Sequence, residues 1–194
     1  MRVQKQDVER RVVVEAYAKY DCAKTGRPLP NFAKWDWLRA DAIDEEMCRA
    51  KLKVGIPAGY LLWDEVELAM DDLRECAVSG GIFPNKPRKL GLLENEGHLV
   101  NWEPDRKTVW FDSIKSGKTF DESAPMLLRP AVSAESPSRW YVEDGSGRAI
   151  AYVANQHIFE PSTTLAIAYL GRKPDSQSSF MRKIFPELLR TENH

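Results

Sequence analysis

The sequence has neither an excess of charge of one sign nor a long apolar run. Its 194 residues carry 28 lysines and arginines against 29 aspartates and glutamates, a formal net charge of −1. This balance excludes a globally basic nucleic-acid-binding protein, so contact with a polyanion must come from a local patch. No apolar stretch approaches the ~20 residues that a membrane-spanning helix needs, and residues 1–7 lack the apolar core of a signal peptide. We therefore expect a cytoplasmic protein. Peripheral attachment to the inner membrane through a partner stays open as an alternative.

Cysteine and histidine are also scarce. Cys22, Cys48 and Cys76 are an odd number of thiols, and their spacing matches no known metal-ligand pattern. Reduced and buried thiols are the simplest interpretation. His98 and His157 have no sequence partner at zinc spacing either. The sequence therefore predicts no zinc site.

Apolar residues in the first 80 positions recur at helical spacing, as at Val8, Val12, Ala16 and Tyr20. Glycine or proline follows each stretch of this kind, which is typical of helix ends. The expected helices run from about residue 8 to Gly26, from 43 to 54 and from 61 to 78.

From residue 90 the pattern changes to short apolar runs separated by turn residues. The expected elements are strands at 90–93, 98–102, 108–111, 126–129 and 139–143, a helix after Gly147, a strand or helical piece at 164–170 and a closing helix at 178–189. The predicted fold class is α+β, with a helical N-terminal region (1–82) packed on a compact α/β region (83–194). Continuous apolar patterning through the junction favours one cooperative unit.

The most informative segment is residues 140–149, Trp-Tyr-Val-Glu-Asp-Gly-Ser-Gly-Arg-Ala. An alternating run ends at Asp144, Gly145 and Gly147 bracket Ser146, and a helical pattern starts around Arg148. A strand, a glycine turn and a helix start concentrate backbone N–H groups and the positive end of the helix dipole at one place. Arginine adds a permanent charge whose planar fork suits phosphate. The segment is thus a candidate anion site, although most turns of this kind only connect elements.

Two carboxylates precede the glycine turn. Glu143 and Asp144 could both face a bound phosphate through a divalent cation. The alternative is a structural role, because Asp before Gly is among the commonest turn pairs.

Other candidate sites have equally simple alternatives. Ser116-Gly117-Lys118-Thr119 looks like the end of a phosphate-binding P-loop, but Asp112 stands where the first glycine is required. Lys118 could still add an isolated charge near an anion.

Basic clusters and tryptophans also allow two interpretations. Basic residues gather at 86–89, 106–107, 172–173, 182–183 and 190, and could form a nucleic-acid groove or only solvated surfaces. The six tryptophans include Trp35, Trp37 and Trp63. They could anchor a core or form a partner-binding patch.

Three segments together resemble the ParB/sulfiredoxin superfamily. They are Ser-Ile-Lys-Ser-Gly at 113–117, Pro-Met-Leu-Leu-Arg-Pro at 125–130 and Glu-Asp-Gly-Ser-Gly-Arg-Ala at 143–149. The chain length and residues 139–149 are similar to the plasmid fertility-inhibition proteins of the Osa-like oncogenic-suppression group. The resemblance covers residues 113–156, and the first 80 residues match no motif.

This resemblance implies a ParB/sulfiredoxin-like C-terminal region and an ATPase and DNase that blocks conjugative or T-DNA transfer. It implies that Gly145, Ser146, Gly147 and Arg148 bind the phosphates of ATP or DNA. Glu143 and Asp144 would hold Mg²⁺, and with Arg148 they would be the catalytic residues.

The resemblance also shows which reaction of the superfamily this sequence does not support. Ser146 and Gly147 stand at the cysteine and histidine positions of the sulfiredoxin box, and sulfur reduction needs a thiolate. The sequence therefore predicts no sulfiredoxin activity. Two alternatives stay open: a non-catalytic inhibitor that binds a conjugation coupling ATPase of a type IV secretion system or its relaxase–DNA complex, and a ParB-like DNA-binding regulator.

Overall fold

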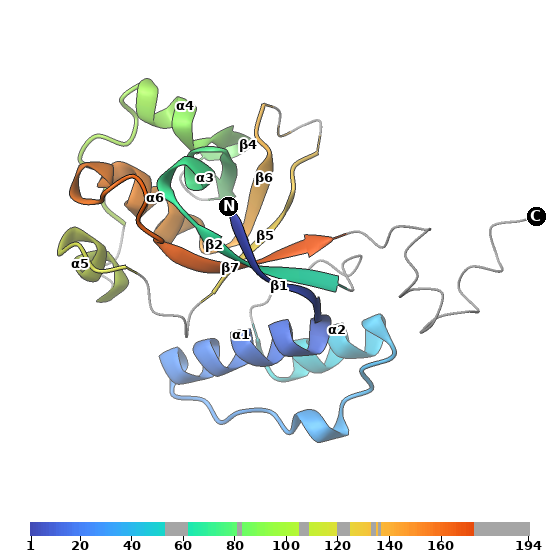
Figure 1. Cartoon of the computed structure of the whole chain (residues 1–194). Helices are drawn as coiled ribbons and strands as arrows, with labels where there is room; N and C mark the ends of the chain where they lie inside the picture. Colours follow the sequence, from blue (N-terminus) through green and yellow to red (C-terminus); the bar gives the residue numbers. More distant parts are fainter. Residues whose placement is uncertain are drawn as a thin grey trace, which may run out of the picture.

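The computed structural model describes residues 1–52, 62–80, 83–104, 109–119, 125–132, 135 and 137–172. Within these ranges the chain forms one mixed seven-stranded sheet in the order β1-β2-β7-β5-β6-β3-β4 (Figure 1). Its strands are β1 (Arg2–Glu9), β2 (Leu62–Leu68), β3 (Cys76–Gly80), β4 (Phe83–Lys89), β5 (Met126–Pro130), β6 (Trp140–Asp144) and β7 (Ala166–Arg172). The pairs β5–β7 and β3–β6 are parallel, and the other neighbours are antiparallel. Helices together with this sheet confirm the α+β class.

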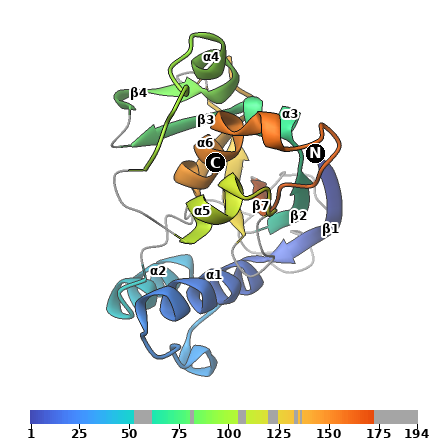
Figure 2. The same ribbon diagram turned by 90° about the vertical axis from the view of Figure 1, so that its left-hand side faces the viewer.

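Helices lie on both faces of the sheet. They are α1 (Arg10–Thr25), α2 (Ala40–Arg49), α3 (Met70–Arg74), α4 (Leu90–Asn95), α5 (Val109–Lys115) and α6 (Ser146–Ala154), with short 3-10 turns η1 (Phe32–Lys34) and η3 (Gln156–Ile158). Helices α1 and α2 lie below the sheet in Figure 1, and α3, α4 and α6 lie above it. Turned by 90°, the molecule shows α5 between α6 and α1 (Figure 2).

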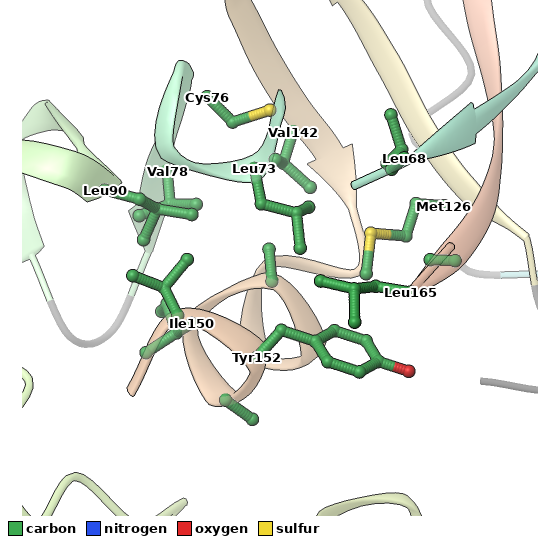
Figure 3. Close-up of a cluster of buried hydrophobic side chains, with 14 of the residues drawn as sticks. Leu68, Leu73, Cys76, Val78, Leu90, Met126, Val142, Ile150, Tyr152 and Leu165 are labelled. Atoms are coloured by element: carbon green, nitrogen blue, oxygen red, sulfur yellow. The ribbon is translucent and has the colours of Figure 1, made fainter. Parts of the chain in front are cut away.

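Alternating side chains of the central strands supply two separate cores. In β5, Met126 and Leu128 join the core beneath α3, α4 and α6, whereas Leu127 joins the core beneath α1 and α2. Successive residues of a strand point to opposite faces of a sheet, so a strand covered on both faces must be apolar throughout. Figure 3 shows the larger core, where Ile150 of α6 points toward Leu90 and Val78 and the Tyr152 ring lies beside Leu165. Each fully buried aliphatic side chain stabilises the fold by about 1.5–3 kcal/mol.

Several predicted elements are confirmed. Helix α1 ends at Gly26, whose φ of 66° is left-handed, as expected of a glycine that closes a helix. Helix α2 covers most of the second predicted helix, and β5, β6 and α6 lie where the pattern placed two strands and a helix. Of the two structures expected at 164–170, a strand or a helical piece, the strand is confirmed, and it is β7. The predicted closing helix at 178–189 lies outside the described residues.

The predicted helix at 61–78 is wrong. These residues contain strand β2, the short helix α3 and strand β3. The apolar positions four residues apart fit a helix, but Val66 and Leu68 face one core while Trp63 faces the other. The N-terminal region is therefore not purely helical, because it contributes β1, β2 and β3 to the sheet.

Three predicted strands are also wrong. Residues 90–93 belong to helix α4, residues 98–102 contain a turn, and the segment at 108–111 enters helix α5. Each run is too short for its apolar pattern to distinguish a strand from one helical turn. The sheet mixes strands from both sides of residue 82, and the cooperative unfolding of the two regions stays a prediction.

Candidate functional site

The turn between β6 and α6 has the geometry of an anion-binding helix start. Gly145 has a φ of 95° and accepts the first helical hydrogen bond, from the N–H of Ala149 at 2.9 Å. A glycine has no side chain to cap the helix, and the first N–H groups of any α-helix lack partners within the helix. The amides of Ser146, Gly147 and Arg148 therefore form the positive end of α6.

Only glycine fits at the start of this turn. A Cβ added to Gly145 would lie 2.9 Å from Cγ of Met126 and 3.0 Å from Nη2 of Arg148. A Cβ on Gly147 would lie 3.3 Å from the ring of Trp110. Neighbouring side chains thus approach the backbone of the turn closely, and the positive φ of Gly145 adds a second reason for glycine there.

A pocket of about 260 Å³ opens at this turn. All six site residues predicted from the sequence, Glu143 to Arg148, line it. Tyr17, Tyr20 and Asp21 of α1 and Trp110 of α5 complete the wall. The spacing of the α1 residues indicates one face of a helix, but no pattern in the sequence shows that this face meets the glycine turn.

Arg148 is anchored inside the protein rather than extended into solvent. Its side chain is 4% exposed, and Nη2 lies 3.3 Å from Oδ2 of Asp144 and 3.4 Å from the carbonyl oxygen of Pro125. The guanidinium also lies 5.5 Å from the ring centroid of Tyr20. Arg148 therefore holds the Asp144 carboxylate in place in the wall of the pocket and compensates its charge.

Tyr17 is a second residue, besides Arg148, that holds the Asp144 carboxylate in place. Burial raises the pKa of the Tyr17 phenol, and the Asp144 carboxylate, to which the hydroxyl donates a hydrogen bond, raises that pKa further. The phenol therefore stays protonated and remains a donor at neutral pH. Helix α1 thereby orients a carboxylate that belongs to strand β6, far along the chain.

Glu143 belongs to a separate ion-pair network. Its carboxylate pairs with Nε of Arg129, whose guanidinium also binds Glu135 through two bonds of 2.5 and 2.7 Å. The guanidinium lies 4.1 Å from the ring centroid of Tyr141. Burial alone would raise the pKa of Glu135, but the bonds from Arg129 and from the Val132 amide hold that pKa below its usual value.

Each of the three carboxylates in the pocket has a cationic partner. Asp21 pairs with Arg27, just as Glu143 pairs with Arg129 and Asp144 with Arg148. The negative charge of the lining is therefore compensated, so the wall does not repel an anion as three unpaired carboxylates would.

The described part of the chain contains no group of three or more histidine, cysteine or acidic side chains placed to hold a metal ion. Mg²⁺ is commonly bound through one or two carboxylates together with substrate phosphates. Glu143 and Asp144 both line the pocket, but they are consecutive in β6 and pair with different arginines, so either one alone could supply such a carboxylate. The predicted Mg²⁺ site therefore stays a prediction.

The P-loop-like segment and the cysteines do not join this pocket, and the basic residues at 106–107, 173, 182–183 and 190 lie outside the described residues. Ser116, Gly117 and Lys118 follow the end of α5, whereas a P-loop must precede a helix. Cys22 and Cys76 are buried, as expected, and burial raises the pKa of Cys76 to about 12. Cys48, in contrast, is exposed on α2.

Comparisons with family models, with curated proteins and with solved structures found no match to this chain. Among the described residues, no helix has the length and apolar character needed to cross a bilayer. The resemblance to the ParB/sulfiredoxin superfamily therefore rests on the three sequence segments named above.

Proposed function

We propose that the chain is a phosphohydrolase that binds ATP and DNA phosphates in the pocket between α1 and the β6–α6 turn. The observation that carries this proposal is a pocket at a helix N-terminus whose lining includes every residue from Glu143 to Arg148. Helix starts that follow a strand through a glycine turn are common phosphate sites. Compensated carboxylates beside that helix start supply groups suited to phosphoryl transfer, which depends on positioning and charge neutralisation.

The contacts assign a role to each group. The amides of Ser146 and Gly147 would donate to phosphate oxygens, and Arg148 would hold Asp144 in place while adding positive charge. Asp144 would orient the attacking water or a metal ion, and Glu143 would assist from its position beside Arg129. When bound, Mg²⁺ would neutralise developing phosphate charge.

The biological role follows from the resemblance. The proposed protein is a plasmid-encoded fertility-inhibition factor of the Osa-like group that acts on DNA during conjugative or T-DNA transfer. Its partners would be DNA, the coupling ATPase of the secretion machine and the relaxase–DNA complex. It would act in the cytoplasm, at the inner membrane only through a partner.

The test compares Asp144→Asn with Asp112→Asn. Asp112 is exposed on α5 and does not line the pocket, so it is a matched control. ATP hydrolysis and Mg²⁺-dependent DNA cleavage are measured for both variants, with circular dichroism melting as the folding control. We expect Asp144→Asn to lower both rates about 10²- to 10⁴-fold, the typical worth of a positioned acid–base group. Equal rates for the two variants would overturn the proposal.

A second candidate function has one observation in its favour. Leu29 and Leu38, in the loop between α1 and α2, are 52% and 78% exposed. Phe32 and Trp37 lie half-buried in the same loop, whereas Trp35 and Trp63 are core residues. Through this loop the protein could bind a coupling ATPase and inhibit transfer without catalysing a reaction. Full inhibition of plasmid transfer by the Asp144→Asn variant would favour this candidate.

A ParB-like regulator is the third alternative. It would bind DNA with strong salt dependence and show no turnover of ATP or DNA in the same assays.

A further inference from the structure

Two aromatic side chains from different helices border the proposed phosphate site. Tyr20 comes from α1 and Trp110 from α5, and both line the pocket while half-buried. Helix α5 lies between α6 and α1 (Figure 2). The two rings therefore reach the first turn of α6 from separate elements, and neither is needed to hold a phosphate.

The surroundings of each ring fix its position. Trp110 approaches the backbone of Gly147 so closely that a Cβ there would lie 3.3 Å from the indole. Phe111 packs edge-on against Trp110, with ring centroids 6.0 Å apart. Tyr20 has Arg148 on one side and Tyr17 edge-on at 6.4 Å. Trp110 is thus held against the backbone of the first turn of α6, and Tyr20 is held beside the Arg148 guanidinium.

This juxtaposition suits a ligand that carries a flat aromatic group next to a phosphate. We propose that the pocket binds one unpaired nucleotide, with its phosphate at the start of α6 and its base against Trp110 and Tyr20. This inference rests on the proposed phosphate site and specifies single-stranded DNA as its substrate class. In a duplex both faces of each base are stacked on neighbouring bases, so only an unpaired base can stack on a protein ring without the cost of unstacking.

The test compares three DNA ligands on the intact protein at one fixed salt concentration. They are a phosphorothioate octathymidylate, an abasic octamer with the same backbone, and a blunt-ended phosphorothioate duplex without loops. Stacking of a single base on an aromatic side chain typically strengthens binding at least about 5-fold. We expect the octathymidylate to bind at least that much more tightly than the abasic octamer and the blunt-ended duplex.

Two further variants, Trp110→Leu and Trp102→Leu, then show whether the preference for DNA that carries bases arises in the pocket. Trp102 is half-buried and packs edge-on against Phe111 at 5.9 Å, but it does not line the pocket. Trp110→Leu should lower affinity for the octathymidylate to that for the abasic octamer and leave abasic binding unchanged. Trp102→Leu should retain the preference for bases. For Tyr20, the Phe variant should retain this preference and the Leu variant should reduce it.

Equal affinities of the wild-type protein for the octathymidylate and the abasic octamer would overturn the inference, and this comparison needs no variant to fold. Equal loss in the Trp110 and Trp102 variants would also overturn it. Failure of the underlying phosphate site is distinguishable, because pyrophosphate would then not compete with the abasic octamer. A base preference at a site elsewhere would survive Trp110→Leu, and that outcome contradicts the inference as well.

Discussion

Gly145 and Arg148 together determine the shape of the candidate site. The positive φ of Gly145 turns the chain from β6 into α6, and the space beside its Cα is filled by Met126 and Arg148. Arg148 then uses its buried guanidinium to hold Asp144. The same two residues are thus required by the fold and by the proposed chemistry.

The first prediction concerns Gly145→Ala, with Gly97→Ala as its matched control. Gly97 also has a positive φ, of 75°, but a Cβ there would meet nothing within 4 Å. Both variants should lose about 1 kcal/mol or more of unfolding free energy from backbone strain. Gly145→Ala should lose about 1–3 kcal/mol more, because its methyl group overpacks against Met126 and Arg148.

Urea unfolding of the two variants measures this difference directly. A loss at Gly145 no larger than that at Gly97 would show that the close packing around the turn is not as described.

At the scale of the elements, ion pairs join strands β5 and β6 in addition to their backbone hydrogen bonds. Arg129 of β5 binds Glu143 of β6 and also Glu135 in the connection between the two strands. Glu135 further accepts a hydrogen bond of 2.9 Å from the Val132 amide. The network thereby ties Val132 and Glu135 to Arg129 and to Glu143 in the wall of the pocket.

A pH-dependent stability follows from this network. The pKa of Glu135 is lower in the folded protein than in the unfolded chain, where a glutamate titrates near pH 4.3. Its contribution to stability is therefore complete above that pH and is lost as the pH falls through the folded pKa. Glu135→Gln should cost about 1–3 kcal/mol at pH 7 and should flatten the decline in unfolding free energy below about pH 4.3.

Chemical denaturation of the wild-type protein, Glu135→Gln and Glu160→Gln between pH 2.5 and 7 provides the measurement. Glu160 is exposed, so its variant should follow the wild-type curve. A Glu135→Gln curve parallel to the wild type over the whole range would contradict the prediction.

The elements also show where sequence reasoning succeeds and where it fails. Strand β6, Gly145 and helix α6 follow from local signals: alternation, a glycine turn and then helical spacing. Strand β1 gives no such signal because nearly all its side chains are exposed, and it is placed by its pairing with β2. The segment of β2 and α3 misleads because burial on both faces of the sheet imitates helical periodicity.

For the whole molecule, the candidate site joins distant parts of the chain. Residues 143–148 form one half of the pocket and could be predicted because they are consecutive. Tyr17, Tyr20 and Asp21 lie more than 120 residues away in sequence, and Trp110 lies on an element predicted as a strand. Their contribution depends on how α1 and α5 pack around the sheet, which no local pattern encodes.

This arrangement gives the N-terminal region a direct part in the proposed chemistry. Helix α1 covers one face of the sheet and supplies the hydroxyl that orients Asp144. The two regions separated at residue 82 in the sequence therefore share both the sheet and the pocket.

Phosphate binding at the start of α6 is the central claim, and backbone amide chemical shifts measure it most directly. Pyrophosphate is titrated into the ¹⁵N-labelled protein with and without Mg²⁺. We predict saturable shifts that are largest at the backbone amides of Ser146, Gly147 and Arg148, with smaller shifts at Tyr20. Unchanged amides at these positions, or larger shifts confined to the basic residues at 86–89 or to Lys118, would contradict the account.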